Sequence, residues 1–398
     1  MMRRVFGALA LSVSHVIGLC SVLPISRLHA QVATKLVTLD SATFQSADSI
    51  AKEQFQLDRL GSIGVAIVVG PRVVWSKSYG FADSAKTRTP DVNTVYRAAS
   101  ITKQLTALMF LQLVERGVVG LSDPVERYVP ELSRLAKKPA GSAPVTLIQL
   151  ATMNGGLARD PSDNRRLAKG PPSAWESAAL EVLEKTQYVR PPGTAYGYSN
   201  IGYVILALAL ERAAKEPYIA YVERNLLRPL GMTSSGFELT PDLRSRLATG
   251  VDWDTLLPDS LNYADAAQDH SGLGVGTASG GLYTTVADLA KLVSAEIGYG
   301  PPTAISPAAL AKRDSISPAV TRDLDVGYGL GYQIYRWGDT LAVGQSGNLS
   351  GYTSQLMYDV RRGFGVVVLR SAAGGKADAG RLAARVFLLI RRRAQPAK

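Results

Sequence analysis

Strand-forming sequence stands near both ends of this chain and helix-forming sequence stands between them, and this arrangement limits the fold more than any other feature. Near the N-terminus two β-rich runs, 62–70 and 72–81, are joined at Gly70-Pro71, as in a hairpin. Four more β-rich runs lie near the C-terminus, at 329–337, 340–347, 352–360 and 363–370. We therefore predict that both chain ends contribute strands to one antiparallel sheet.

Helical patterns occur at 43–60, at 376–393 and through most of the segment between the two β-rich groups. The simplest packing covers the sheet with the two terminal helices and inserts a mostly helical region at about 118–275. The predicted fold class is therefore α+β, an α/β sandwich, in which residues 31–398 form one interleaved domain.

The first thirty residues have the pattern of an export signal. Two arginines, Arg3 and Arg4, precede an apolar stretch at 5–23, and the sequence LHA at 28–30 fits a cleavage site. We predict a periplasmic or secreted protein with no stable membrane span after removal of the signal. A transmembrane anchor is the alternative, although the apolar stretch is short and interrupted. The arginine pair also resembles a twin-arginine signal, and lipidation at Cys20 is disfavoured by the large residue before it.

Removal of this signal, residues 1–30, would remove the sole cysteine and two of the three histidines. The remaining chain then offers no disulfide, thiol nucleophile or histidine-rich zinc site, so we expect neither a metal nor a cofactor. A Ser-His-Asp triad would need His270, the remaining histidine, as its base, and the sequence has no G-x-S-x-G elbow. A serine hydrolase with this sequence therefore needs another proton acceptor, with His270 as the alternative.

The net charge of +11 favours anionic surfaces or substrates, but the charges are dispersed along the chain. The one cluster, Arg391-Arg392-Arg393, fits the C-terminal end of a helix, where cations suit the dipole. Since no basic patch is interleaved with aromatic residues, we expect no nucleic-acid partner.

Ser100 and Lys103 stand at the start of an almost uninterrupted apolar helix pattern. On a helix, residues three apart share a face, with Cβ atoms about 5–6 Å apart. Burial disfavours the charged form of a lysine and lowers its pKa, and a deprotonated amine beside a hydroxyl is a base beside a nucleophile. We predict that Lys103 moves the proton of Ser100. The alternative is an N-cap serine with a solvated lysine, and the same S-x-x-K spacing occurs at 49–52 with no sign of chemistry.

Tyr198 and Asn200 lie in a segment predicted to be extended, just before an apolar helix that starts near Ile201. Residues two apart in an extended segment point the same way, so a phenol and an amide would face one site. The phenol can share the proton network of an ammonium, and the amide can donate to a substrate carbonyl. The alternative is that Asn200 caps the helix and Tyr198 packs over it.

The stretch 343–355, VGQSGNLSGYTSQ, is rich in glycine within a predicted strand. Glycine in a strand indicates close approach to the backbone, and free N–H groups at a strand edge could hold an acyl substrate or its oxyanion. The alternative is a tight connection between two strands.

Taken in order, the S-x-x-K pair, the Y-S-N at 198–200 and the Gly-flanked Ser-Gly at 346–347 resemble motifs of the serine β-lactamase and penicillin-binding-protein superfamily. The most similar branch comprises class C β-lactamase-like and D-alanyl-D-alanine carboxypeptidase-like proteins with related esterases. Further stretches that resemble this family lie at 96–132, 191–211, 229–237 and 278–292.

The resemblance implies a β-lactamase/transpeptidase-like fold and assigns roles to individual residues. Ser100 would be the acylated nucleophile, Lys103 would accept or relay its proton, and Tyr198 would act as general acid or base. Asn200 would bind the amide of the substrate. The backbone N–H groups of Ser100 and Asn348 would form the oxyanion hole, where one donor is typically worth about 3–4 kcal/mol. The strand residues with expected substrate contacts are Gln345, Ser346, Gly347 and Asn348.

The chain departs from the family pattern in two places. The strand motif commonly begins with lysine or histidine, where this chain has Gln345, which cannot supply a positive charge to a substrate carboxylate. This difference weakens the expectation of β-lactams or peptides ending in D-alanine as substrates. A loop that often reads His-Thr-Ser-Gly-Leu is Met-Asn-Gly-Gly-Leu at 153–157, which we interpret as altered packing of the site wall.

The expected function is therefore an exported serine hydrolase that forms an acyl-enzyme on Ser100, of the esterase or D-peptidase type, acting on small-molecule or peptide acyl substrates. The alternatives are a true class C-like β-lactamase and a non-catalytic binder of cell-wall peptides. The sequence leaves open the oligomeric state, the rate of deacylation and the choice between periplasm and exterior.

Overall fold

The fold is seen in a computed structural model, which describes residues 36–135, 138–162, 169–253, 261–262, 269–316, 319–320 and 326–396. The predicted signal peptide at 1–30 lies outside these ranges.

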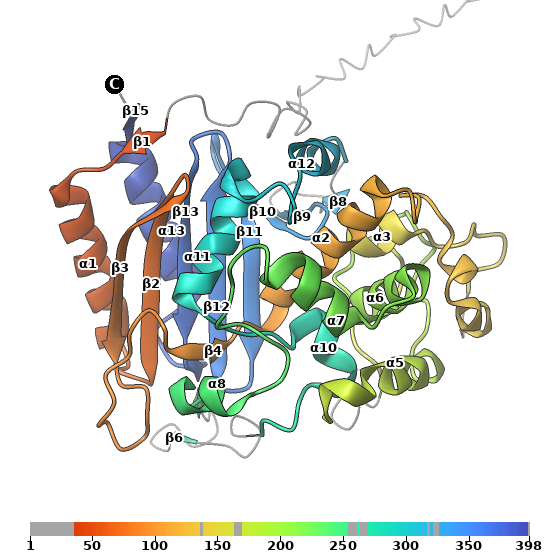
Figure 1. The fold of residues 1–398 in the computed structure, drawn as a ribbon, viewed down its shortest axis with the longest axis horizontal. Coiled ribbons are helices and arrows are strands. Elements are labelled where there is room, and N and C mark those ends of the chain that lie inside the picture. Colours follow the sequence, from red (N-terminus) through yellow and green to blue (C-terminus); the bar gives the residue numbers. More distant parts are fainter. Residues whose placement is uncertain are drawn as a thin grey trace, which may run out of the picture.

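Both ends of the chain build one eight-stranded sheet in the order β3-β2-β13-β12-β11-β10-β9-β8 (Figure 1). Its strands are β2 (Ser62–Val69), β3 (Arg72–Gly80), β8 (Ala319–Val320), β9 (Val326–Tyr328), β10 (Gln333–Trp337), β11 (Thr340–Leu349), β12 (Tyr352–Asp359) and β13 (Phe364–Arg370). The two ends meet where β13 pairs antiparallel with β2, from Phe364 against Val69 to Arg370 against Ile63. The predicted antiparallel sheet from both chain ends is confirmed.

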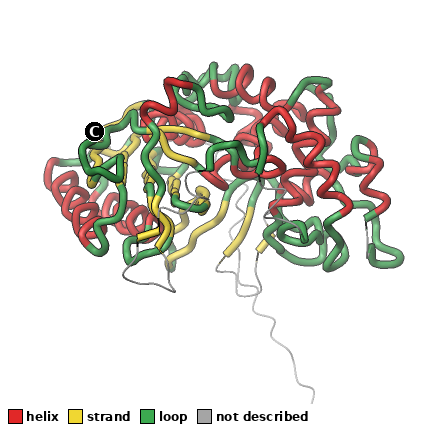
Figure 2. Tube along the Cα trace, turned by 90° about the horizontal axis from the view of Figure 1, so that it is seen from below, coloured by secondary structure: helices red, strands yellow, loops and turns green. Residues whose placement is uncertain are grey.

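Helices cover both faces of this sheet, because its central strands are apolar on both sides. Alternate residues of β2, such as Val65 and Ile67, belong to the apolar cluster that includes the buried side of α13 (Ala379–Arg393), which lies beside α1 (Ser41–Gln56). Ala66 and Val68 face the opposite way, into the core that contains α11 (Val286–Ser294). Figure 2 shows strands with helices on either side.

The other helices gather mainly beyond the β11 and β10 side of the sheet, on the right of Figure 1. They are α2 (Thr102–Glu115), α3 (Leu147–Ala151), α5 (Trp175–Glu184), α6 (Asn200–Ala214), α7 (Tyr218–Val222), α10 (Thr277–Gly280) and α12 (Pro307–Asp314). Another helix, α8 (Pro241–Arg246), lies at the bottom of the sheet in Figure 1. The short strands are β1 (Val37–Thr38), β4 (Val95–Arg97), β5 (Val251–Trp253), β6 (Leu261–Asn262), β7 (Tyr283–Thr285), β14 (Ala372–Ala373) and β15 (Gln395–Pro396). None of the helices in the described ranges is long and apolar enough to cross a membrane.

The predicted strand at 329–337 begins later than expected, at Gln333. Gly331 has a φ of +84°, and a Cβ there would lie 2.3 Å from Cβ of Ala107 in α2. The chain therefore turns against α2 before it can enter β10, and the preceding residues form the separate strand β9. The glycines of the next strand do not interrupt it, since β11 continues through Gly344 and Gly347 to Leu349.

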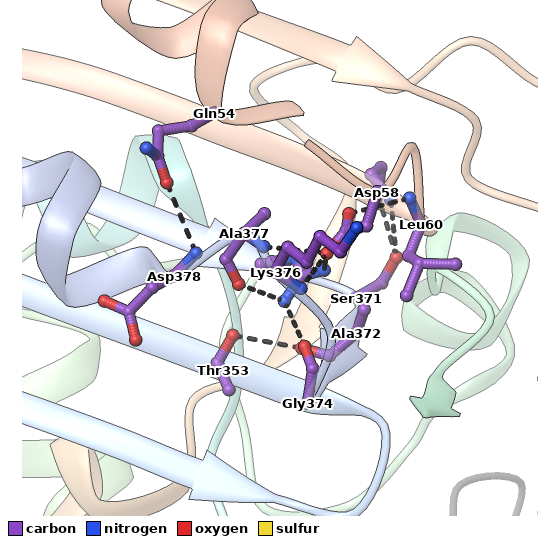
Figure 3. A network of polar contacts seen from close by, with 12 residues as sticks. Gln54, Asp58, Leu60, Thr353, Ser371, Ala372, Gly374, Lys376, Ala377 and Asp378 are labelled. Carbon is purple, nitrogen blue, oxygen red and sulfur yellow. Dashed lines mark hydrogen bonds and ion pairs between the residues drawn. The ribbon is translucent and has the colours of Figure 1, made fainter. Parts of the chain in front are cut away.

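A buried ion pair fixes the end of α1 to the end of β13 (Figure 3). The Asp58 carboxylate accepts hydrogen bonds from Arg370 and from the backbone N–H groups of Lys376 and Ala377, each at 2.8 Å. The side chains of Asp58 and Arg370 are only 2% and 1% exposed. Because an uncompensated buried charge is costly, removal of either partner should destabilise the junction of the two chain ends.

Candidate active site

Ser100 lies in a tight turn clamped between two parts of the fold. It is the middle residue of a 3₁₀ turn, Ala99–Ile101, that leads directly into α2. On one side the N–H of Ala98 donates to the carbonyl of Leu282 at 2.8 Å. On the other side β11 approaches so closely that a Cβ on Gly347 would lie 2.4 Å from the carbonyl oxygen of Ala98. The predicted close approach at this glycine is therefore made by the turn that carries Ser100.

The backbone just before Ser100 is strained. Ala99 has a φ of +50°, a left-handed conformation that residues with a Cβ adopt at a cost of order 1–3 kcal/mol. The hydroxyl of Thr102 donates to the carbonyl of Ala99 at 2.7 Å and accepts from the N–H of Leu282 at 3.2 Å. These bonds hold the turn in the conformation that presents Ser100.

Lys103 is fully buried one turn after Ser100. Its Nζ lies 3.1 Å from Ser100 Oγ and donates to the carbonyl of Ser279 at 2.7 Å. Burial lowers the pKa of Lys103 to about 7, with Asp160 acting to raise it and Arg159 to lower it. The alternative of a solvated lysine is therefore wrong, and close to neutral pH the amine is available in its unprotonated form.

Tyr198 forms part of the wall around this amine. Its ring centroid is 5.2 Å from Lys103 Nζ, and that of Tyr203 is 5.8 Å away, so aromatic faces take the place of water around the ammonium. Burial raises the pKa of Tyr198 to about 12, while hydrogen bonding with Ser100 and the charge of Arg159 act to lower it. At neutral pH the phenol is therefore protonated and can donate, whereas the amine can accept.

The segment of Tyr198 is supported by the loop at 153–157. The N–H of Gly197 donates to the carbonyl of Met153 at 2.7 Å, and that of Gly193 donates to the carbonyl of Asn154 at 2.8 Å. These contacts place the loop against the segment that carries Tyr198, and the effect of its unusual sequence on packing of the site wall stays a prediction.

Asn200 is the first residue of α6 and not its cap. The cap is Ser199, whose Oγ accepts from the N–H of Gly202 at 2.9 Å, so the alternative that Asn200 caps the helix is wrong. The side-chain amide of Asn200 instead donates to Oδ1 of Asp160 at 2.7 Å. The predicted extended segment ends at Ser199, yet Tyr198 and Asn200 both belong to the site.

A cavity of about 130 Å³ opens beside Ser100. Its lining residues are Ala99, Ser100, Asp160, Pro161, Asn200, Ile201, Val204, Leu273, Val275, Gly276, Ser279, Gly280, Asn348 and Leu349. It therefore brings three of the predicted residues, Ser100, Asn200 and Asn348, to one space.

The edge of β11 is uncovered next to this cavity. Pairing with β10 ends at Gly344, opposite Gln333. The N–H of Ser346 points to that edge, because it donates to Oε1 of Gln333 at 3.0 Å. Amides two residues apart on a strand point the same way, so the N–H of Asn348 faces the uncovered edge as well. This orientation is the one that an oxyanion donor would require.

Gln345 lies behind the site wall and not on the surface of the cavity. It is fully buried, its Oε1 accepts from the hydroxyl of Tyr328 at 3.0 Å, and its Nε2 donates to the carbonyl of Ser346 at 3.0 Å. Gln345 also contributes to lowering the pKa of Tyr198 through a hydrogen bond. The structure thus places the side chain of Gln345 beside the phenols of Tyr328 and Tyr198. A direct contact of Gln345 with substrate remains a prediction.

His270 does not contact Ser100. Its Nδ1 lies 3.3 Å from the hydroxyl of Tyr283, and burial together with Arg97 and Arg244 lowers the pKa of His270 to about 4. The alternative with His270 as the base therefore has no geometric support. In the part of the chain that the structure describes, no group of three or more histidine, cysteine, aspartate or glutamate side chains could hold a metal ion.

Sequence reasoning missed Asp160 and Arg159, which flank Tyr198 and Asn200 in the structure. Arg159 lies with its guanidinium 5.2 Å from the ring centroid of Tyr198. Neither residue belongs to a periodic pattern or a recognised motif, so nothing in the sequence singled them out. Ser279, which accepts from Lys103, stands within the stretch 278–292 that resembles the family.

Together, the sheet topology and the serine–lysine–tyrosine cluster define a fold and site of the β-lactamase and penicillin-binding-protein type. A model of the beta-lactamase family matches residues 47–390, so the chain belongs to this family. The predicted superfamily is confirmed.

Individual relatives agree with this assignment. The chain is 30% identical to Beta-lactamase-like protein 2 of Dictyostelium discoideum over 330 residues, which cover 80% of this chain and 57% of that protein. It is 32% identical to the D-alanyl-D-alanine-carboxypeptidase/endopeptidase AmpH of Escherichia coli K12 over 191 residues, which cover 47% and 48%. The octameric penicillin-binding protein homologue from Pyrococcus abyssi superposes with a TM-score of 0.72 at 25% identity, covering 87% of this chain and 77% of that one. The chain spans about half the length of the curated relatives it matches.

Proposed function

We propose that this protein is a serine hydrolase that forms an acyl-enzyme on Ser100. The observation that carries the proposal is the 3.1 Å distance between Ser100 Oγ and a fully buried Lys103 amine with a pKa lowered to about 7. A base with a pKa close to the working pH is the kind that accepts a proton efficiently and returns it.

The reaction starts when the neutral amine of Lys103 takes the proton of Ser100 and Oγ attacks the acyl carbonyl carbon. The carbonyl oxygen becomes an oxyanion, which the N–H groups of Ser100 and Asn348 stabilise. The protonated Lys103 and the hydroxyl of Tyr198 then return a proton to the leaving group as its bond to the acyl carbon breaks. Water attacks the acyl-enzyme by the reverse route, releases the acid and restores Ser100.

The substrate is proposed to be a small ester or a peptide-like amide. Gln345 is neutral and buried, so this side chain brings no cation to the site for the carboxylate that β-lactams and peptides ending in D-alanine carry. A true β-lactamase is therefore the second candidate, favoured by the family and by the intact cluster around Ser100. Export to the periplasm or the exterior belongs to the same proposal and depends on residues 1–30.

A fluorophosphonate probe tests the proposal directly. Wild-type protein should gain the mass of one probe on Ser100, and Ser100→Ala should gain none while its thermal unfolding stays unchanged. Hydrolysis of a short-chain ester, a D-Ala-D-Ala peptide and a cephalosporin should then be compared. Absence of labelling in folded wild type would favour a non-catalytic binder, and equal turnover of the cephalosporin and the ester would favour the β-lactamase.

A further inference from the structure

Asp160 is the only ionisable side chain among the described residues that line the cavity beside Ser100. Most of the remaining lining is apolar, from Ile201, Val204, Leu273, Val275 and Leu349. A carboxylate in such surroundings favours a ligand that carries a positive charge close to an apolar group.

The hydrogen bond between Asp160 and Asn200 fixes which atoms the cavity presents. A carboxylate can only accept, so the group of Asn200 that lies 2.7 Å from Asp160 Oδ1 is its NH₂. The amide oxygen of Asn200 has no hydrogen-bond partner among the described residues. Asp160 and Asn200 together therefore offer acceptor oxygens on this side of the cavity, and an ammonium group has three N–H donors to match them.

Arg159 does not remove this preference. Its Nε lies 3.2 Å from Oδ2 of Asp160, but its side chain is 69% exposed. Ion pairs that are this exposed are worth only about 0–1 kcal/mol. A substrate cation held inside the cavity can therefore compete with Arg159 for the carboxylate.

The volume of the cavity restricts the rest of the ligand. At about 130 Å³ it is smaller than the roughly 300–1,000 Å³ of typical ligand pockets. It suits the side chain and amino group of one amino acid better than a long acyl chain or a branched ring system.

We propose that the cavity receives the acyl part of an amino acid ester or amide with a free amino group and a small apolar side chain, with the ammonium held by Asp160 and Asn200. This inference rests on the proposed acyl-enzyme function of Ser100. Asp160 acts on specificity, since it binds the part of the substrate that does not react.

The test compares leucine methyl ester with 4-methylpentanoate methyl ester, which differs only in lacking the amino group, and uses both enantiomers of leucine. The full-length wild type should have a kcat/KM at least about tenfold higher for one leucine ester than for the ester without the amino group. Asp160→Asn, which keeps the size of the side chain, should reduce this ratio about tenfold, and Arg159→Gln should increase it. The matched control is Glu53→Gln in α1, which removes a carboxylate that pairs with Arg385 of α13. This variant should leave the ratio unchanged.

The α-ammonium group also makes the ester carbonyl of leucine methyl ester more electrophilic, so the change of the ratio between wild type and Asp160→Asn, and not its value in wild type, reports binding of the ammonium. Effects of the substitutions on the reactivity of Lys103 act on both esters and cancel in that change. Equal kcat/KM for the two esters in wild type, or an unchanged ratio in Asp160→Asn, would overturn the inference while leaving the proposed function in place. No hydrolysis of either ester together with no probe on Ser100 would overturn both.

A second measurement needs no variant. Leucinamide should slow fluorophosphonate labelling of Ser100 in wild type, and 4-methylpentanamide at the same concentration should slow it less. Equal protection by the two amides would contradict the binding of an ammonium group, whatever the stability of Asp160→Asn.

Discussion

Two buried cations in this protein have opposite surroundings. Arg370 and Lys103 are both almost completely removed from water, at 1% and 0% exposed. Arg370 meets the carboxylate of Asp58 at 2.8 Å, whereas Lys103 meets a serine hydroxyl, a carbonyl oxygen and two aromatic rings. A guanidinium paired with a carboxylate stays charged and ties the chain ends together, while an amine without such a partner gives up its proton readily. Burial thus serves stability at one position and reactivity at the other.

Replacement of Lys103 by methionine should separate these two uses of burial most clearly. Lys103→Met keeps a similar length and removes the base, so acylation of Ser100 should fall by about 10³–10⁴-fold. Its melting temperature should equal or exceed that of wild type, because a buried amine is replaced by an apolar group. Probe labelling and thermal unfolding of the same samples measure both effects. Labelling at the wild-type rate would show that Lys103 is not the base.

Removal of the carboxylate that pairs with Arg370 should change the stability of the protein and leave its activity unchanged. Asp58→Asn leaves the buried charge of Arg370 without its carboxylate, so the free energy of unfolding should fall by about 3–5 kcal/mol. The matched control is Glu53→Gln on α1, whose carboxylate pairs with Arg385 of α13 at the surface and should cost about 1 kcal/mol or less. Denaturant unfolding gives both values. The kcat of each variant, with the concentration of active sites measured by fluorophosphonate labelling of a separate sample, should remain that of wild type. A similar loss in both variants would mean that the buried pair has no special role.

Local features of this protein could be predicted from the sequence, whereas contacts between distant residues could not. Strands 62–70 and 363–370 were recognisable because they are short apolar runs bounded by turn residues, and their place in one sheet was predicted as the simplest packing of strands from both chain ends. The direct pairing of these two strands was not predicted and is seen only in the structure. Ser100 and Lys103 were recognisable because their spacing is local. Asp58 with Arg370, and Asp160 with Asn200, are 312 and 40 residues apart in the chain, and no periodic pattern connects such partners.

The orientation of the Gln345 side chain could not be predicted from the sequence for a different reason. The sequence has a neutral amide, Gln345, where the family that it resembles commonly has a cation. Whether the amide of Gln345 faces the substrate or the phenol of Tyr198 depends on its rotamer. The hydroxyl of Tyr328 selects that rotamer by donating a hydrogen bond to Oε1 of Gln345 at 3.0 Å. A contact between β9 and β11 of this kind becomes visible only when the strands are placed.

The smallest expected effect concerns the pH dependence of the Lys103 site. Because the folded pKa of Lys103 is about 7, kcat/KM for an ester should rise with pH through that value as the ammonium loses its proton, and then level off. Asp160 raises the pKa of Lys103 and Arg159 lowers it, so Asp160→Asn should move the midpoint of the profile down and Arg159→Gln should move it up. Tyr198 should not contribute to this limb, since burial raises its pKa to about 12. A midpoint that moves the same way in both variants would contradict the assignment to Lys103.

Stability should follow the same titration with a definite sign. An unfolded lysine keeps its proton up to its ordinary pKa of about 10.5, whereas the folded Lys103 has lost most of it above about 7. Between these values unfolding takes up a proton, so the free energy of unfolding of wild type should rise with pH relative to that of Lys103→Met. Arg370 gives no such slope, because its guanidinium stays protonated in both states. A difference between wild type and Lys103→Met that is independent of pH would mean that Lys103 is charged in the folded protein, and its environment would then resemble that of Arg370.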